Sequence, residues 1–205
     1  MPVPIVYRTG ASILANYNFA ELASGQGYLT LYGGQADPSQ DVLSNITFHS
    51  LPGWDDLQNT SSWPTLQKTY NFDLLLNRPM EIIGKALVNI PFYHNHSGAS
   101  NPRWQFTVSL IDWDGVTETL LATADSQIFT QTGSGGNLTS AIVMDITSIQ
   151  RVKKNNYLRL KVECYAGANS GTVHFHVGHD PSGDLGTSSL SNSVLVAFVP
   201  VRIDI

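Results

Sequence analysis

The alternation of apolar and polar residues is most regular between Arg103 and Ala122, where it predicts a β-hairpin. Apolar side chains fall on one face of the first strand and polar ones on the other (Trp104, Phe106, Val108 and Leu110 against Gln105, Thr107 and Ser109). Asp114-Gly115 lies between the two halves and suits a tight turn, because the central residues of such a turn need positive φ. The hairpin therefore offers one apolar face for packing.

The same alternation recurs in short runs separated by turn signals, and it predicts about ten to twelve strands along the chain. We expect a bulge at Gly84, a long surface loop over 51–65, and short helical turns at 16–24 and 145–153. The remaining strands are expected at 28–32, 42–50, 68–76, 80–92, 123–132, 138–146, 157–165, 172–178 and 193–205.

Closely spaced strands with little helix indicate an all-β protein. The fold that we predict is an antiparallel two-sheet β-sandwich of the jelly-roll type, with one or two short helical turns. A length of 205 residues suits one domain, spanning 1–205, with a short N-terminal arm over about 1–15.

The composition narrows the partners that this fold can have. Charged residues make up 13% of the chain and hydrophobic residues 42%, so the surface is polar without being highly charged, as in many secreted or self-assembling β proteins. The net charge of −5 and the lack of a basic cluster beyond Arg151, Lys153 and Lys154 argue against a nucleic-acid partner. We recognise no signal peptide and no membrane-spanning run, and therefore expect a soluble protein without a membrane partner.

Histidines near the end of one predicted strand are the most suggestive candidates for a metal site. His174 and His176 share a face of the strand, and His179 follows closely, with Asp180 beside it. Zinc or iron could use such ligands, but the spacing matches no metallo-hydrolase pattern. We therefore favour no metal at this site and interpret the histidines as surface or interface residues.

No other motif indicates catalysis. Asp112 and Asp114 resemble the start of a calcium loop, yet the residues that follow continue a strand, so a hairpin turn is favoured. Cys164 lies within a strand-like run and is interpreted as a buried apolar residue. Because no nucleophile motif, phosphate-binding loop or acid pair is present, we predict that the protein is not an enzyme and has no catalytic residues or cofactor.

Two groups of residues are candidates for binding. Trp54 and Trp63, with Asp55 beside the first, lie in the predicted loop, where tryptophan either plugs the end of a sandwich or stacks on a sugar or a neighbouring subunit. Val3, Ile5 and Tyr7 lie in the proline-bearing arm, which suits addition to the sheet edge of another subunit.

Several runs, together with the order of the strands, resemble virion structural proteins of tailed phages and environmental viruses. These runs are Phe19–Gly33, Phe72–Met80, Ala86–Phe92 and Thr117–Ala122. The resemblance implies a jelly-roll or β-sandwich subunit that decorates, cements or projects from a capsid and has no active site.

Three functions follow as hypotheses. The first is a non-enzymatic virion structural protein, a capsid decoration, cement or minor capsid subunit that binds copies of itself and other capsid proteins after synthesis in the host cytoplasm. The alternative is a carbohydrate-binding β-sandwich module, in a receptor-binding spike or fibre head, that holds a surface glycan through Trp54 and Trp63. The weaker alternative is a metal-dependent enzyme built on the histidines.

Overall fold

Twelve β-strands make up the regular structure in the part of the chain that the computed structural model describes. That part covers residues 26–37, 40–48, 50, 54–130, 135–182 and 194–202, with only the backbone described for Asp37 and Trp54. No helix occurs in these ranges, so the all-β prediction is confirmed, whereas the predicted helical turn at 16–24 lies outside the described residues. The strands are β1 (Gln26–Asp37), β2 (Gln40–Ser44), β3 (Trp54–Asn59), β4 (Thr65–Leu75), β5 (Met80–Ser100), β6 (Arg103–Trp113), β7 (Glu118–Asp125), β8 (Phe129–Thr130), β9 (Gly136–Val152), β10 (Tyr157–Gly167), β11 (Ser170–Gly178) and β12 (Leu195–Arg202).

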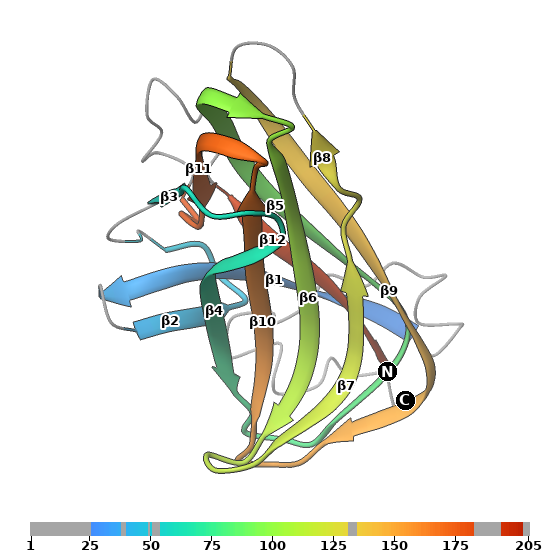
Figure 1. Cartoon of the computed structure of the whole chain (residues 1–205). Coiled ribbons are helices and arrows are strands. Elements are labelled where there is room, and N and C mark those ends of the chain that lie inside the picture. The colour runs from blue at the N-terminus through green and yellow to red at the C-terminus, as the bar shows by residue number, and fades with distance from the viewer. Residues whose placement is uncertain are drawn as a thin grey trace, which may run out of the picture.

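Hydrogen bonding joins these strands into one large mixed sheet. The order is β3-β11-β5-β12-β1-β2-β4-β10-β6-β7, with β8 paired to β6 and β9 paired to β5. In Figure 1, β4, β10, β6 and β7 lie nearest the viewer, while β5, β12 and β1 cross behind them. The pairing therefore does not separate the strands into the two antiparallel sheets that we predicted.

The front and back strands are joined through β2 and β4. Their only ladder contact in the described residues is one parallel bridge between Val42 and Asp73. Where the two strands have no further ladder hydrogen bonds, the Asp41 side chain links them. The backbone N–H of Asn71 donates to Asp41 Oδ2 at 3.0 Å, and Gln35 Nε2 donates to Asp41 Oδ1 at 2.9 Å. Asp41 thus satisfies polar groups where the strands diverge.

The hairpin predicted around Asp114 is confirmed. β6 pairs with β7, and Gly115 has a φ of 98°, which an L side chain rarely adopts. Asp114 Oδ1 accepts the N–H groups of Val116 at 2.9 Å and Thr117 at 2.7 Å, which closes the loop. The four apolar residues predicted on one face of the first strand are all buried (Trp104, Phe106, Val108 and Leu110).

Other predicted boundaries are wrong. Trp54–Asn59 forms a strand within the predicted surface loop, and β5 continues to Ser100 through a predicted loop. β1 likewise extends to Asp37 through a predicted turn region. Residues 145–152 belong to β9 and not to a helical turn, because β5 supplies ladder partners out to Val152. The predicted bulge at Gly84 is confirmed by a register shift beside it.

An apolar core fills the space between the front and back strands. Phe92 of β5 meets Phe106 of β6 edge-on, with ring centroids 5.0 Å apart, and meets Phe129 at the same distance. At Gly33 of β1, a Cβ would come within 3.3 Å of the Phe72 ring, which shows how closely β1 and β4 pack. Cys164 is buried in this core, as predicted. No helix in the described residues has the length and apolarity to cross a bilayer.

Candidate functional sites

Pairing of β3 with β11 determines where the predicted acidic and histidine candidates lie. His176 lies opposite Asp56, and Val177 lies opposite Asp55. Successive strand residues point to opposite faces, so Asp55 faces the same side as the buried Val177, while Asp56 faces outward. The two aspartates therefore belong to different environments.

The three candidate metal ligands are not brought together. His176 Nε2 lies 3.2 Å from Asp56 Oδ1 on the outer face, whereas His179 Nε2 lies 3.4 Å from Asp55 Oδ2 on the inner side. His174 pairs with Gln58 across the ladder. No group of three or more His, Cys, Asp or Glu residues in the described ranges is arranged to hold a metal ion.

His179 and Asp55 form part of a buried polar cluster with Ser50. Ser50 Oγ lies 3.5 Å from His179 Nδ1, and it accepts the backbone N–H of Gln35 at 2.8 Å. The backbone N–H of Ser50 donates to Asp180 Oδ1 at 3.4 Å. These contacts tie β1 and Ser50 to the residues that follow β11, which are distant in sequence.

The cluster contains a serine, a histidine and an aspartate, the groups of a hydrolytic triad, but its geometry differs. The aspartate contacts Nε2 and the serine contacts Nδ1, the reverse of the usual orientation. Ser50 and His179 have no exposed surface, and both contacts are longer than a good hydrogen bond. In this arrangement the cluster links segments and presents no nucleophile to a substrate.

The charge state of Asp55 is set by its neighbours. Burial favours the neutral acid, but polar contacts with His179 and Tyr70 and the attraction of His179 and Lys68 outweigh it, so the pKa of Asp55 falls to about 2. Lys68 Nζ lies 3.5 Å from Asp55 Oδ2. Burial also raises the pKa of the Tyr70 hydroxyl and the Cys164 thiol well above their usual values. Cys164 therefore stays a neutral thiol.

The predicted aromatic binding site is only partly described. Trp63 is half-buried, and its backbone packs so closely on Gly167 that a Cβ at Gly167 would lie 2.7 Å from Trp63 Cα. The side chain of Trp54 lies outside the described residues, as do Val3, Ile5 and Tyr7 of the arm. Their proposed roles in sugar binding and subunit contact stay predictions.

A shallow apolar groove lies on the outer side of β1, β12, β5 and β9. Phe198 pairs with Leu87 and Leu87 pairs with Val143, so these three side chains form one row across the strands. Tyr28 and Lys85 also line the groove, whose volume is about 490 Å³. Val143 is 51% exposed and Tyr28 is 45% exposed. We call Tyr28, Leu87, Val143 and Phe198 the groove face.

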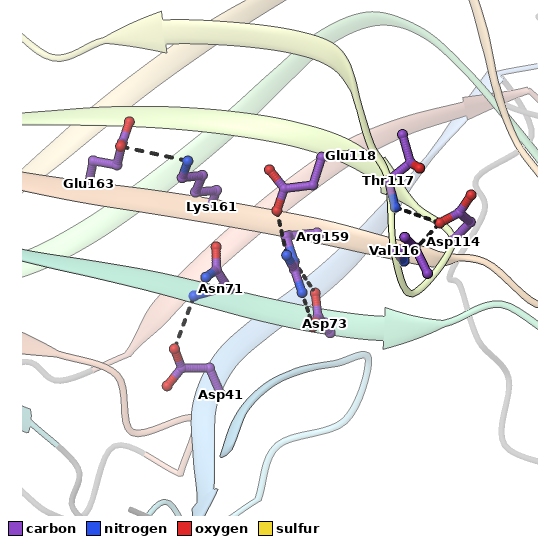
Figure 2. A network of polar contacts seen from close by, with 10 residues as sticks. All are labelled: Asp41, Asn71, Asp73, Asp114, Val116, Thr117, Glu118, Arg159, Lys161 and Glu163. Carbon is purple, nitrogen blue, oxygen red and sulfur yellow. Dashed lines mark hydrogen bonds and ion pairs between the residues drawn. The ribbon is translucent and has the colours of Figure 1, made fainter. Parts of the chain in front are cut away.

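An ion-pair network centred on Arg159 lies on the outer side of β4, β10, β6 and β7 (Figure 2). Arg159 donates from Nε and Nη2 to the two oxygens of Asp73, at 2.7 and 2.8 Å, and from Nη1 to Glu118. The Arg159 guanidinium also lies 3.8 Å from the centre of the Trp113 ring. The hydrogen bonds to Asp73, with the hydrogen bond to Glu118 and the negative charges of both carboxylates, outweigh the opposing effect of burial and raise the pKa of Arg159.

We did not predict the Arg159 network from the sequence. The available signal was a charged residue at an outward position of the strand-like run 157–165, two positions after Tyr157. That signal does not identify the partners, because Asp73 and Glu118 lie on other strands. Only the pairing of β10 with β4 and β6, and of β6 with β7, brings the four strands together.

Comparisons with known proteins show a shared fold. No protein-family model matches the sequence, and no curated protein matches it. An aminopeptidase from the marine sediment archaeon Thaumarchaeota archaeon matches with a TM-score of 0.57 at 12% identity, over 87% of this chain and 37% of that chain. A CocE/NonD family hydrolase from Staphylococcus aureus matches with a TM-score of 0.51 at 13% identity, over 86% of this chain and 37% of that chain. The chain thus spans well under half of each hydrolase.

These matches contradict the prediction that the protein is not an enzyme. The two hydrolases above, and an α-amino acid ester hydrolase with a TM-score of 0.51 at 12% identity, share the fold over most of this chain. The absence of a catalytic motif in the sequence was therefore insufficient ground for excluding an enzyme. At such low identity, the likeness shows the fold alone.

Viral structures also match, at lower similarity. The structure of infectious bursal disease virus, Gx strain, matches with a TM-score of 0.37 at 15% identity, over 82% of this chain and 40% of that chain. Solved viral structures are thus among the structural neighbours. A TM-score of this size is too low to carry an argument about function, and the link to tailed phages is untested.

Proposed function

We propose that the chain is a structural subunit of a virion, with the strands arranged as a jelly roll. It serves as a capsid decoration, cement or minor capsid protein that associates with copies of itself and with other capsid proteins. The observation that carries the proposal is the groove face, an apolar surface on which Val143 and Tyr28 are about half exposed. Contiguous exposed apolar surface favours contact with another protein.

The edge next to the groove face supports self-association. β9 pairs with β5 along one side, and in the described ranges β7 approaches its other side without forming a hydrogen-bonded ladder. Across its 17 residues β9 carries two charged side chains, Asp145 and Arg151, while Leu138, Val143 and Ile149 are 41 to 51% exposed. A long edge with so few charges is suited to pairing with another chain.

The charges beside the groove also suit a second copy. Lys85 and Asp145 form an ion pair 3.2 Å long, and both side chains are more than half exposed. In a two-fold contact, Lys85 of each copy can face Asp145 of the other. The same face therefore offers an apolar row and self-complementary charges.

The mass of the purified protein in solution, measured by light scattering, tests the proposal. We expect a defined oligomer that also saturates a fixed number of sites on capsids lacking the protein. Val143→Lys should weaken both associations at least tenfold, whereas Leu120→Lys, a matched change at a residue 58% exposed on β7, should leave them intact. The proposal would be contradicted if the protein is a monomer that does not bind capsids, or if the two variants associate equally well.

A second candidate is a β module that works with a hydrolytic domain. The three hydrolases with TM-scores above 0.5 favour it, because the chain corresponds to 36 to 37% of their length. Assays with an aminoacyl p-nitroanilide and an α-amino acid ester test whether the purified chain itself has hydrolytic activity. Turnover of either substrate by the purified wild-type chain would favour this candidate over the virion subunit.

A further inference from the structure

A second outward surface lies near the hairpin loop, where four strands end side by side. Tyr157 of β10 lies opposite Leu75 of β4 on one side and Trp113 of β6 on the other, and Trp113 lies opposite Glu118 of β7. These four residues form one row across the sheet. The row belongs to the outer side that carries the Arg159 network (Figure 2), not to the groove face.

Trp113 is held in place within this row. The Arg159 guanidinium packs 3.8 Å from the centre of the indole ring, and the Tyr157 ring lies 5.0 Å away at an angle of 41°. Arg159 is only 8% exposed, while Trp113 is partly exposed. Because the guanidinium packs over one face of the Trp113 ring, we infer that a ligand would contact the other face or the edge of the ring.

Polar groups surround this ring. Glu118 is 41% exposed, and Arg159 occupies one of its carboxylate oxygens. Further along the same outer side, Lys161 and Glu163 form an ion pair of 3.7 Å, and both side chains are less than a third exposed. Arg159, Glu118, Lys161 and Glu163, which Figure 2 shows, supply hydrogen-bond donors and acceptors on the same outer side as Trp113, and Glu118 lies opposite Trp113 across the ladder.

We propose that this surface binds a neutral oligosaccharide. The outer face of Trp113 would stack on a pyranose ring, and Glu118 would accept a hydrogen bond from a sugar hydroxyl group. A sugar ring has an apolar face and a rim of hydroxyl groups, which match an aromatic ring bordered by polar side chains. The proposal places glycan binding at Trp113 and Tyr157 and not at Trp54 and Trp63. It does not rest on the virion proposal.

The charges on this surface select among sugars. Asp73, Glu118 and Glu163 are acidic, against the basic Arg159 and Lys161, and the chain as a whole is acidic. Asp73 and Glu118 already neutralise Arg159 through direct ion pairs, so little positive charge remains for an anionic sugar. Sialylated or sulfated glycans should therefore bind more weakly than neutral ones.

An array of neutral and anionic oligosaccharides, followed by calorimetric titration with maltohexaose and cellohexaose, tests the proposal. We expect neutral glycans to bind and Trp113→Ala to weaken binding at least tenfold. Trp63→Ala, a change at another half-buried tryptophan, and Trp54→Ala should both leave binding unchanged. Circular dichroism confirms that each variant is folded.

A milder pair of variants keeps the test decisive if Trp113→Ala does not fold. Trp113→Phe retains a smaller ring and should weaken binding several-fold, and Glu118→Gln should do the same by removing the charged acceptor. The proposal is overturned if no neutral glycan binds the wild-type protein, if the Trp113 variants bind as the wild type does, or if Trp54→Ala or Trp63→Ala abolishes binding instead.

Discussion

The buried cluster of Ser50, His179 and Asp55 and the network around Arg159 both place an aspartate beside a basic side chain, with opposite results. In the Arg159 network both carboxylate oxygens of Asp73 accept hydrogen bonds of 2.7 and 2.8 Å. In the buried cluster the contacts are 3.4 and 3.5 Å long, and neither Asp55 Oδ2 nor His179 Nε2 has a hydrogen bond of normal geometry in the described residues.

The difference follows from the shapes of the side chains and from their surroundings. A guanidinium is planar and presents paired donors that match a carboxylate, so one arginine can bind Asp73 with two parallel bonds and Glu118 with a third. An imidazole offers two nitrogens pointing in different directions, and the packed core restricts how His179 can turn toward both neighbours. The two networks should therefore respond differently to substitution and to pH.

Loss of the Arg159 guanidinium should produce the largest effect. Arg159→Met leaves Asp73 and Glu118 without their cation and should lower the free energy of unfolding by about 3 kcal/mol. Urea denaturation measures this change. Lys85→Met is the control, because the Lys85–Asp145 pair is exposed and its loss should cost less than about 0.5 kcal/mol. Equal losses in the two variants would mean that the Arg159 network adds no more stability than a surface pair.

Lowering the pH should remove the contribution of Asp55, in the buried cluster, to the free energy of unfolding. The pKa of Asp55 falls from 3.8 to about 2 on folding, so its stabilising contribution is complete above about pH 5 and is lost as the pH falls toward 2. With a discount for partial exposure, the contribution is about 1 to 2 kcal/mol. The unfolding free energies of the wild type and Asp55→Asn, compared at neutral and at strongly acidic pH, measure it.

Replacement of Asp55 by Asn should lower the free energy of unfolding more at neutral pH than in acid. The wild type should be more stable than Asp55→Asn at neutral pH, and the difference should shrink in acid. Asp56→Asn changes the carboxylate on the opposite face, which is 61% exposed, and should cost less than about 0.5 kcal/mol. A difference between the wild type and Asp55→Asn that stays constant with pH would show that Asp55 has the same pKa in both states.

Removal of the Ser50 hydroxyl should have the smallest effect of the three. Ser50→Ala leaves the buried backbone N–H of Gln35 without its 2.8 Å acceptor, which should cost about 1 kcal/mol. Thermal unfolding of the variant measures the loss. Ser44→Ala provides the comparison, because Ser44 Oγ accepts the Ile46 N–H in an exposed position, where water can replace it. If Ser50→Ala and Ser44→Ala lower the stability equally, burial does not strengthen the hydrogen bond to Ser50.

Local patterns predicted much of this fold correctly. The hairpin at Asp114-Gly115, the buried face of its first strand, the bulge at Gly84 and the burial of Cys164 all follow from side-chain alternation and glycine conformation. These features depend on residues near one another in the chain. Sequence alone thus determined an all-β fold and the position of its central hairpin.

Tertiary structure decided the features that depend on distant pairing. Trp54–Asn59 becomes a strand because β11, more than a hundred residues later, supplies its ladder, and 145–152 stays extended because β5 runs beside it. The pairing of β3 with β11 also places Asp56 near His176 and Asp55 near His179. The pairing of β10 with β4 and β6, and of β6 with β7, joins Arg159 to Asp73 and Glu118. Alternation along a strand indicates which of its residues share a face. The neighbours of those residues on adjacent strands depend on strand order and register, which are decided only when the whole sheet assembles.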